Sequence, residues 1–250
     1  FILSAMEPMI QVAGVRSAAE AAGLLAAGVR WLGFPLRLPV HRPDTSEEVA
    51  AAIVAGLPAA AIPVLITYER TAVAVADFCR SLGVRHVQLH GPVPVAELER
   101  LRRLEPGLFV IKSLVVGRQT LLELEEERRQ SEPWVDAFIT DTHDPRTGAD
   151  GATGRLHDWG VSRRPVEASR RPVILAGGLT PDNVRAAILA VRPAGVDAHT
   201  GLEDAAGDKD LDLVRQFLEQ ARLAFAELAT AADGPSPAGA RPAEDSPGRC

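Results

Sequence analysis

Two glycine-containing loops are the clearest candidates for a binding site in this chain. Residues 176–183 and residues 197–201 each follow a short apolar run. Glycine lets the backbone approach a ligand closely, and the free N–H groups at the start of a helix favour an anion. Two such loops together favour a phosphate site over two tight turns that merely require glycine. The predicted phosphate contacts are Gly177, Gly178, Thr200 and Gly201.

Titratable side chains also follow short apolar runs. Asp141 and Asp197 are candidate catalytic groups, because each carboxyl group lies at the end of an apolar run, where a parallel sheet places its functional side chains. Lys112 would pair with a phosphate or carboxylate, the rarer alternative for a lysine at a strand end being a Schiff base. Five of the six histidines occupy similar positions: His41, His90, His143, His157 and His199.

The segment 141–154 is long, polar and rich in glycine, which predicts a loop that covers a binding site. Two aspartates and a histidine within residues 141–144 are metal-ligand types, but no second set of ligands has a diagnostic spacing. We therefore expect no metal ion. Cys79 and Cys250, the two cysteines, indicate neither a disulfide framework nor a zinc site.

Short aliphatic runs alternate with amphipathic segments along most of the chain, as in a parallel sheet that is buried on both faces. We predict strands at residues 9–13, 30–34, 61–66, 86–89, 109–111, 135–140, 172–175 and 195–197. We predict helices at residues 18–27, 46–55, 71–82, 95–104, 121–129, 161–170, 181–191 and 210–228. This alternation indicates an α/β protein with a single (β/α)8 TIM barrel, whose chemistry sits where strands end. A doubly wound sheet is the rival, but no G-x-G-x-x-G follows the first run.

The composition is that of one globular domain. The 250 residues are 46% hydrophobic and 24% charged, which is ordinary usage for a chain that can bury a full core. A net charge of −6 offers no basic field for nucleic acid or an anionic membrane. We predict an N-terminal extension at 1–8, a barrel at 9–230 and a disordered tail at 231–250. We expect a cytoplasmic monomer or homodimer that binds a small phosphorylated substrate.

Several motifs over residues 9–228 resemble, in order and spacing, those of the phosphoribosylanthranilate isomerase family. The matches are GF at 33–34, the arginine of SPRYV at Arg42, QLHG at 88–91, GGTG…FDW at 151–159, LAGGLTPENV at 175–184, and VDVSSGVE at 196–203 with KD at 209–210. One short motif would say little, but this combination is highly specific for the family.

The resemblance implies a barrel enzyme of tryptophan biosynthesis that needs no cofactor. Its reaction would be an Amadori rearrangement, the aldose-to-ketose isomerisation of a phosphorylated aminosugar. A general acid opens the furanose ring, and a general base removes the proton from C2′. The family's acid is an aspartate that Asp141 matches. By the same resemblance Arg42 and His90 would bind the substrate, and Gly154 would join the phosphate loops. Lys112 is a further candidate for substrate binding because it follows the run at 109–111.

The base position departs from the family pattern. The family's KICG motif supplies a cysteine as the base, but here it reads Gln11-Val12-Ala13-Gly14, and alanine accepts no proton. Asp197 or His199 would have to replace that base, or turnover would be slow and Ala13→Cys would raise it by at least about tenfold. Two alternatives stay open. One is a divergent enzyme, such as a lyase, an aldolase or another isomerase, acting on a different phosphorylated or anionic compound. The other is a non-catalytic phosphosugar-binding protein.

Overall fold

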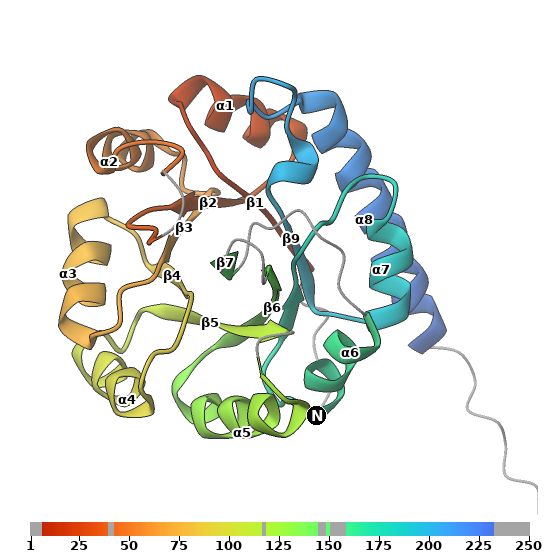
Figure 1. Cartoon of the computed structure of the whole chain (residues 1–250). Coiled ribbons are helices and arrows are strands. Elements are labelled where there is room, and N and C mark those ends of the chain that lie inside the picture. Colours follow the sequence, from red (N-terminus) through yellow and green to blue (C-terminus); the bar gives the residue numbers. More distant parts are fainter. Residues whose placement is uncertain (1–6, 40–42, 117–118, 145–148, 151–158, 233–250) are drawn as a thin grey trace, which may run out of the picture.

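The computed structural model describes residues 7–39, 43–116, 119–144, 149–150 and 159–232, with the backbone alone for 142–144 and 149–150. Within these residues the sheet has nine strands, of which all but the short β7 are parallel. The parallel strands follow the order β5-β4-β3-β2-β1-β9-β8-β6, and pairing of β5 with β6 closes them into a barrel. Helices surround this barrel (Figure 1), so the predicted (β/α)8 fold is confirmed.

The elements follow the predicted alternation closely. The strands are β1 (Met9–Ala13), β2 (Trp31–Pro35), β3 (Ile62–Thr67), β4 (His86–Leu89), β5 (Phe109–Val116), β6 (Ala137–Asp144), β7 (Ala149–Asp150), β8 (Val173–Leu175) and β9 (Gly195–Ala198). The α-helices are α1 (Ala18–Ala27), α2 (Glu47–Gly56), α3 (Ala72–Leu82), α4 (Val95–Leu104), α5 (Leu121–Ser131), α6 (Trp159–Ala168), α7 (Val184–Val191) and α8 (Leu211–Ala232). Two 3-10 turns are η1 (Glu132–Trp134) and η2 (Thr200–Leu202).

Local capping explains where several helices begin. Ser17, Ser46, Thr71 and Thr120 precede α1, α2, α3 and α5, and the hydroxyl of each accepts a hydrogen bond from the backbone N–H three residues later. These bonds satisfy N–H groups that have no partner inside the helix. Gly28 ends α1 with a φ of 99°, a left-handed conformation that glycine adopts without steric cost.

The strands separate two apolar layers because successive side chains of a strand point to opposite faces. One layer fills the barrel interior, and the other lies between the strands and the helices. The interior layer consists of Met9, Ala13, Val64, Ile66, Ile111, Ala137, Ile139, Ile174 and Ala176. Small and branched residues fill the interior as packed layers, so the site lies at the end of the barrel where the strands terminate, here called the mouth.

Two strands extend at least four residues beyond their predicted ends. β5 continues to Val116 and β6 to Asp144, so Lys112 and Asp141 lie within strands rather than at their ends. The prediction stopped where the apolar run met a charged residue. Backbone pairing of β5 with β6 does not depend on side-chain polarity, and it continues from Ile111 opposite Ala137 to Val116 opposite Thr142.

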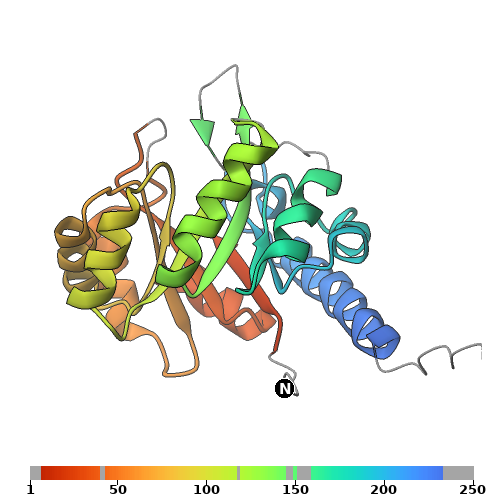
Figure 2. The ribbon, with the colours of Figure 1, turned by 90° about the horizontal axis from the view of Figure 1, so that it is seen from below.

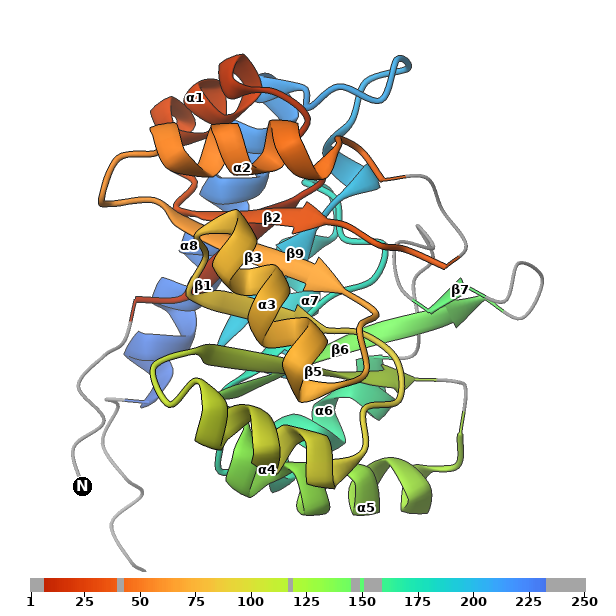
Figure 3. The same cartoon turned by 90° about the vertical axis from the view of Figure 1, so that its left-hand side faces the viewer.

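The expected loop after the sixth parallel strand begins as a β-hairpin. β7 pairs antiparallel with the end of β6, so the chain turns back on itself at the mouth. Figure 2 and Figure 3 show β6 and β7 extending beyond the neighbouring parallel strands. The remainder of this segment, including residues 151–158, lies outside the described residues.

The last two helices differ slightly from their predicted bounds. α7 begins at Val184 rather than at residue 181, because residues 181–183 form a turn instead of helix. α8 continues to Ala232, two residues past the predicted end of the barrel. Both ends of the predicted domain division fall largely outside the described residues, namely at 1–6 and 233–250. Among the described helices, none is long and apolar enough to cross a membrane.

Candidate active site

A chain of polar side chains crosses the barrel at its mouth. Gln11 of β1 donates from Nε2 to Asp197 Oδ1 of β9 at 3.0 Å and to Gln88 Oε1 of β4 at 2.9 Å. Gln88 Nε2 lies 2.7 Å from His90 Nε2, and His90 Nδ1 lies 3.6 Å from Asp141 Oδ2 of β6. The predicted catalytic residues Asp141 and Asp197 are therefore the two ends of one polar chain.

The order of hydrogen-bond donors along this row of polar side chains defines which ring nitrogen of a neutral His90 carries the proton. Because Gln88 Oε1 accepts from Gln11, its Nε2 must be the atom that donates to His90 Nε2. Neutral imidazole then carries its proton on Nδ1, which faces the carboxyl group of Asp141. Tyr68 stacks on the ring of His90 with centroids 5.3 Å apart, and this contact holds the imidazole in place.

Ala13 lies where β1 ends and belongs to the apolar layer of the barrel interior. Its methyl side chain offers no proton acceptor. The next residue, Gly14, has a φ of 84°, and a Cβ there would come within 2.1 Å of His199 Nε2. The imidazole of His199 therefore occupies the space beside the end of β1, and only glycine leaves room for it.

His199 belongs to a cluster of four charged groups. Its Nε2 lies 3.5 Å from Asp44 Oδ2 and 3.2 Å from Glu203 Oε1, and Lys209 Nζ lies 2.5 Å from the same Glu203 oxygen. Burial alone would lower the pKa of His199, but hydrogen bonds with Asp44 and Glu203 outweigh it and raise that pKa to about 9. The hydrogen bond with His199 lowers the pKa of Glu203 to about 2. At neutral pH the imidazole is therefore a cation.

Asp197 lies two residues before His199 in a different environment. Burial raises the pKa of its carboxyl group to about 6, although the hydrogen bond from Gln11 and the charges of His199 and Lys209 act in the opposite direction. Gln11 is neutral, so it stabilises the carboxylate less than a cation would. A carboxyl group with a pKa near 6 is ionised at neutral pH and retains some basicity.

The two glycine loops lie against each other. Gly177 and Gly178 have φ values of 101° and 62°. The side chain of Asn183 closes their loop, because its Oδ1 accepts from Thr180 N and its Nδ2 donates to Gly178 O, both at 2.9 Å. A Cβ on Gly201 would come within 2.1 Å of Leu179 O, so the loop after β9 packs directly on the loop after β8. The four predicted phosphate contacts thus lie in two adjoining loops.

Lys112 does not join the other candidates. Its register partners Leu89 and Phe138 belong to the apolar layer between strands and helices, so its side chain points away from the barrel interior. The buried ammonium donates to Glu127 Oε1 of α5 at 2.9 Å and to the carbonyl oxygens of Gly91 and Ser113. The expectation that Lys112 lies at a strand end facing the site was wrong, because its position in β5 directs it outward.

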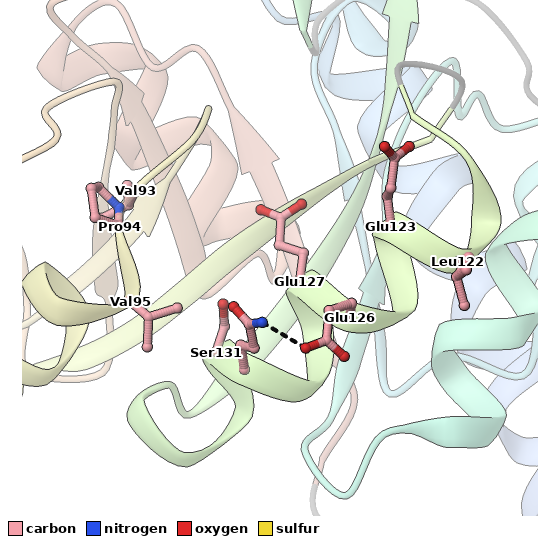
Figure 4. Close-up of a pocket in the computed structure, with 9 residues that line it drawn as sticks. Val93, Pro94, Val95, Leu122, Glu123, Glu126, Glu127 and Ser131 are labelled. Atoms are coloured by element: carbon pink, nitrogen blue, oxygen red, sulfur yellow. Dashed lines mark hydrogen bonds between the residues drawn. The ribbon is translucent and has the colours of Figure 1, made fainter.

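Glu127 also lines a groove between α4 and α5 on the outer surface of the barrel (Figure 4). This groove has a volume of about 580 Å³ and includes the exposed Leu122. Because it lies on the helix side of the strands, it is separate from the polar chain at the mouth.

Two of the predicted site residues, Arg42 and Gly154, lie outside the described residues, as do His41 and His157. For His143 the backbone is described, and it forms part of β6. Among the side chains that the structure does describe, no three histidine, cysteine, aspartate or glutamate residues come together to hold a metal ion.

Sequence reasoning missed two residues that the structure places next to the candidates. Gln11 lies two positions before Ala13, so the alternation of a strand already placed both side chains on one face. That signal was available. Asp44 lies in the segment between β2 and α2, and its carboxylate lies 3.5 Å from His199 Nε2, a contact that no local pattern indicates.

The fold and the site define a class of protein, a single-domain (β/α)8-barrel enzyme with two buried carboxyl groups joined by polar side chains at the carboxyl ends of its strands. The model of one family, described as N-(5′-phosphoribosyl)anthranilate (PRA) isomerase, matches residues 10–220. The chain belongs to this PRA isomerase family, whose members are isomerases of the tryptophan pathway.

Individual relatives and solved structures that are similar to this chain are also PRA isomerases. The chain is 37% identical over 218 residues to N-(5′-phosphoribosyl)anthranilate isomerase 2 of Methanosarcina mazei, a match that covers 86% of this chain and 95% of the relative. The crystal structure of phosphoribosyl anthranilate isomerase from Thermotoga maritima has a TM-score of 0.73 and 26% identity, covering 86% of this chain and 99% of that one. A PRA isomerase in complex with reduced 1-(o-carboxyphenylamino)-1-deoxyribulose 5-phosphate shares the fold, with a TM-score of 0.70, 24% identity, and coverage of 86% and 99%.

Proposed function

We propose that this chain isomerises N-(5′-phosphoribosyl)anthranilate with Asp141 as the general acid. Membership of the family supports the reaction, and the polar chain that ends on Asp141 supports the assignment of the acid. The observation that carries the proposal is the position of this buried carboxyl group, which reaches the barrel interior from β6 while the glycine loops adjoin at the ends of β8 and β9.

Each group then has one task. Asp141 gives its proton to the furanose ring oxygen as the ring C–O bond breaks, and the electron pair of the anthranilate nitrogen forms the C=N bond of the open-chain iminium. His90 holds the carboxyl group of Asp141 in place. The phosphate binds to the N–H groups of the loops at 177–178 and 200–201, joined by Gly154, and Arg42 holds the anthranilate carboxylate.

The second half of the reaction needs a proton acceptor for C2′. Ala13 cannot supply it, so we expect the native chain to turn over the substrate more slowly than an Ala13→Cys variant. A general base typically raises a reaction rate by about 10²–10⁴-fold. A well-placed thiolate at residue 13 should therefore raise the rate of turnover by at least about tenfold. Arg42→Ala in the same variant should abolish that gain.

Loss of anthranilate-type fluorescence measures this reaction directly. The purified chain should convert phosphoribosylanthranilate, and Asp141→Asn should reduce kcat by about 10²-fold or more because the amide has no acidic proton to give. Asp212→Asn is the matched control, since it makes the same change on the exposed surface of α8 and should leave kcat unchanged. Equal rates for native chain and Asp141→Asn would remove Asp141 from the mechanism.

The alternatives have less support. A Schiff-base lyase or aldolase would need a lysine amine in the barrel interior, and Lys112 points to the helix side, where it pairs with Glu127. A phosphosugar-binding protein without activity would be stabilised thermally by phosphoribosylanthranilate but would release no product. We further propose a cytoplasmic enzyme that is a monomer or a homodimer, and light scattering of the purified chain distinguishes these two states.

A further inference from the structure

The proposed isomerisation leaves one role without a residue, that of the proton acceptor for C2′. Among the described residues next to the end of β1, two carry a carboxylate or an imidazole that could replace a base at residue 13, whereas the ammonium of Lys209 beside Gly14 is paired with Glu203. These two are Asp197, whose carboxylate hydrogen-bonds Gln11 of β1, and His199, whose ring lies against Gly14. The charged and polar groups that contact each side chain determine which of the two can accept a proton.

His199 is unsuited to accept a proton. Its Nε2 faces the carboxylates of Asp44 and Glu203, and this pair of anions keeps the imidazole protonated through the neutral range. A protonated imidazole has no lone pair to offer. Removing a proton from this ring would also leave two carboxylates in a buried cluster with Lys209 as their remaining cation.

Asp197 has the opposite arrangement. The amide of Gln11 donates to one carboxylate oxygen, and no described cation forms an ion pair with this carboxylate. Gln11 and Ala13 lie two positions apart on β1, and the register sets Asp197 directly opposite Gln11. The carboxylate therefore enters the barrel interior on the same face of the sheet as the side chain of residue 13.

The groups around Asp197 come from every neighbouring strand. On the β1 side lies neutral Gln11, and beyond it Gln88 and His90 of β4 lead to Asp141 of β6. On the β8 side lie the apolar Ile174 and Ala176. Among the described residues, the positive charges that act on Asp197 are those of His199 and Lys209, and both groups pair with Glu203.

We propose that Asp197 is the catalytic residue that accepts the C2′ proton in this chain, and that Gln11 is the positioning residue that holds its carboxylate without neutralising it. This inference rests on the proposed isomerisation. The family's KICG motif has a lysine where this chain has Gln11, so the motif departs at both positions that face the barrel interior. Loss of the base at residue 13 is thereby accompanied by a neutral amide, instead of a cation, at the position that contacts Asp197.

The proton transfers balance over one cycle. After Asp141 has opened the ring, the carboxylate of Asp197 takes the proton from C2′. The C–H electron pair forms the C1′=C2′ bond, and the iminium pair returns to nitrogen to give a neutral enolamine. Protonated Asp197 then returns a proton to C1′, and the enol hydroxyl gives its proton to the carboxylate of Asp141. The ketone forms, and both groups regain their starting states.

A base exchange between two positions tests this assignment. In the native chain Asp197→Asn should lower kcat by about 10²–10⁴-fold, the usual contribution of a general base. In an Ala13→Cys background the same Asp197→Asn change should cost less than about tenfold, because the thiolate has taken over the proton transfer. A structural role for Asp197 would produce equal losses in both backgrounds and would overturn the proposal. Thermal unfolding of all four proteins shows that each variant is folded.

The pH dependence of kcat/KM gives an independent readout. The acidic limb of the native profile should rise with pH with a midpoint at about 6, because the free carboxylate of Asp197 is the active form. In Gln11→Lys an adjacent ammonium lowers the pKa of Asp197, so the midpoint should move down by at least about one unit. In Ala13→Cys it should move up toward the ordinary thiol value of about 8.5. An unchanged midpoint in Gln11→Lys would contradict the role of Gln11.

The outcomes separate the two proposals. Native turnover that survives Asp197→Asn within about tenfold overturns the inference and leaves the isomerase function intact. Turnover by Ala13→Cys together with none by the native chain also overturns the inference, because no group then replaces the base. Absence of turnover in the native chain and in Ala13→Cys, with phosphate still bound, overturns the proposed function itself.

Discussion

Asp197 and His199 lie two residues apart where β9 ends, yet their surroundings impose opposite protonation behaviour. Asp197 enters the barrel interior beside apolar side chains and one neutral amide, and burial raises its pKa to about 6. His199 sits between two carboxylates in the loop, and they raise its pKa to about 9. The comparison shows that partners, more than depth, decide which of two neighbouring groups stays charged and which can exchange a proton near neutral pH.

The same contrast extends to stability. The cluster of His199, Asp44, Glu203 and Lys209 pairs every charge, so it stabilises the fold in its ionised state. Asp197 forms no ion pair with any residue that the structure describes, and burial makes its ionisation at neutral pH unfavourable in the folded protein. Groups that are poised for chemistry commonly lower stability in this way. Three predictions test this difference between the cluster and Asp197.

Breaking the cluster should have the largest effect. Glu203→Ala leaves the fully buried ammonium of Lys209 without its carboxylate partner. Removing one member of a buried ion pair typically costs about 3–5 kcal/mol, because the remaining charge stays desolvated. Urea unfolding at pH 7 should show this loss, whereas Glu219→Ala on the exposed face of α8 should change the free energy of unfolding by less than about 0.5 kcal/mol. Similar values for both variants would mean that the cluster contributes no stability.

Neutralising Asp197 should stabilise the protein. Its folded-state pKa of about 6 lies above the ordinary 3.8, so the folded protein binds the proton more tightly. The stability that this proton provides is complete below pH 4 and lost as the pH rises through about 6, a loss of about 3 kcal/mol for two units. Asp197→Asn should therefore be more stable than the native chain at pH 7 by up to about that amount. The advantage should disappear near pH 4, and an advantage that persists there would have another origin.

Removing the imidazole of His199 should change how the free energy of unfolding depends on pH above 6.5. His199 has a raised pKa, so its contribution is fully present below pH 6.5 and is lost as the pH rises through about 9. We expect the native free energy of unfolding to fall by about 1–3 kcal/mol across this window, because the shift is shared with Asp44 and Glu203. His199→Gln should show a flatter profile from pH 6.5 to 9 in the same urea experiments. A native profile that is already flat would contradict the ionised cluster.

Local patterns predicted most of the fold. β1, β4, α1 and α4 have the predicted bounds, because a strand buried on both faces and an amphipathic helix each carry their signal in a few consecutive residues. The ends of β5 and β6 were missed. Their extensions depend on pairing between two strands that lie more than 20 residues apart, and no local window contains both partners.

The candidate site divides in the same way. Asp141, Asp197 and the glycine loops could be found because the barrel places chemistry where strands end. Lys112 was placed wrongly because the predicted strand ended at residue 111, whereas β5 continues to Val116 and the alternation of its side chains directs Lys112 to the helix side. The tertiary contact between Asp44 and His199 could not be predicted at all.

By itself the sequence determined the barrel, the acid candidate and the absence of a base at residue 13. These follow from residue types, spacing and alternation, which are local properties of the chain. Only the tertiary structure decided which neighbour can replace that base. The charge state of Asp197 and of His199 depends on Gln11, Asp44 and Glu203, which approach them through strand pairing and loop packing. Burial and the charge of neighbouring groups arise only when the strands and loops are packed together. The fold therefore sets the protonation states of Asp197 and His199 on which catalysis depends.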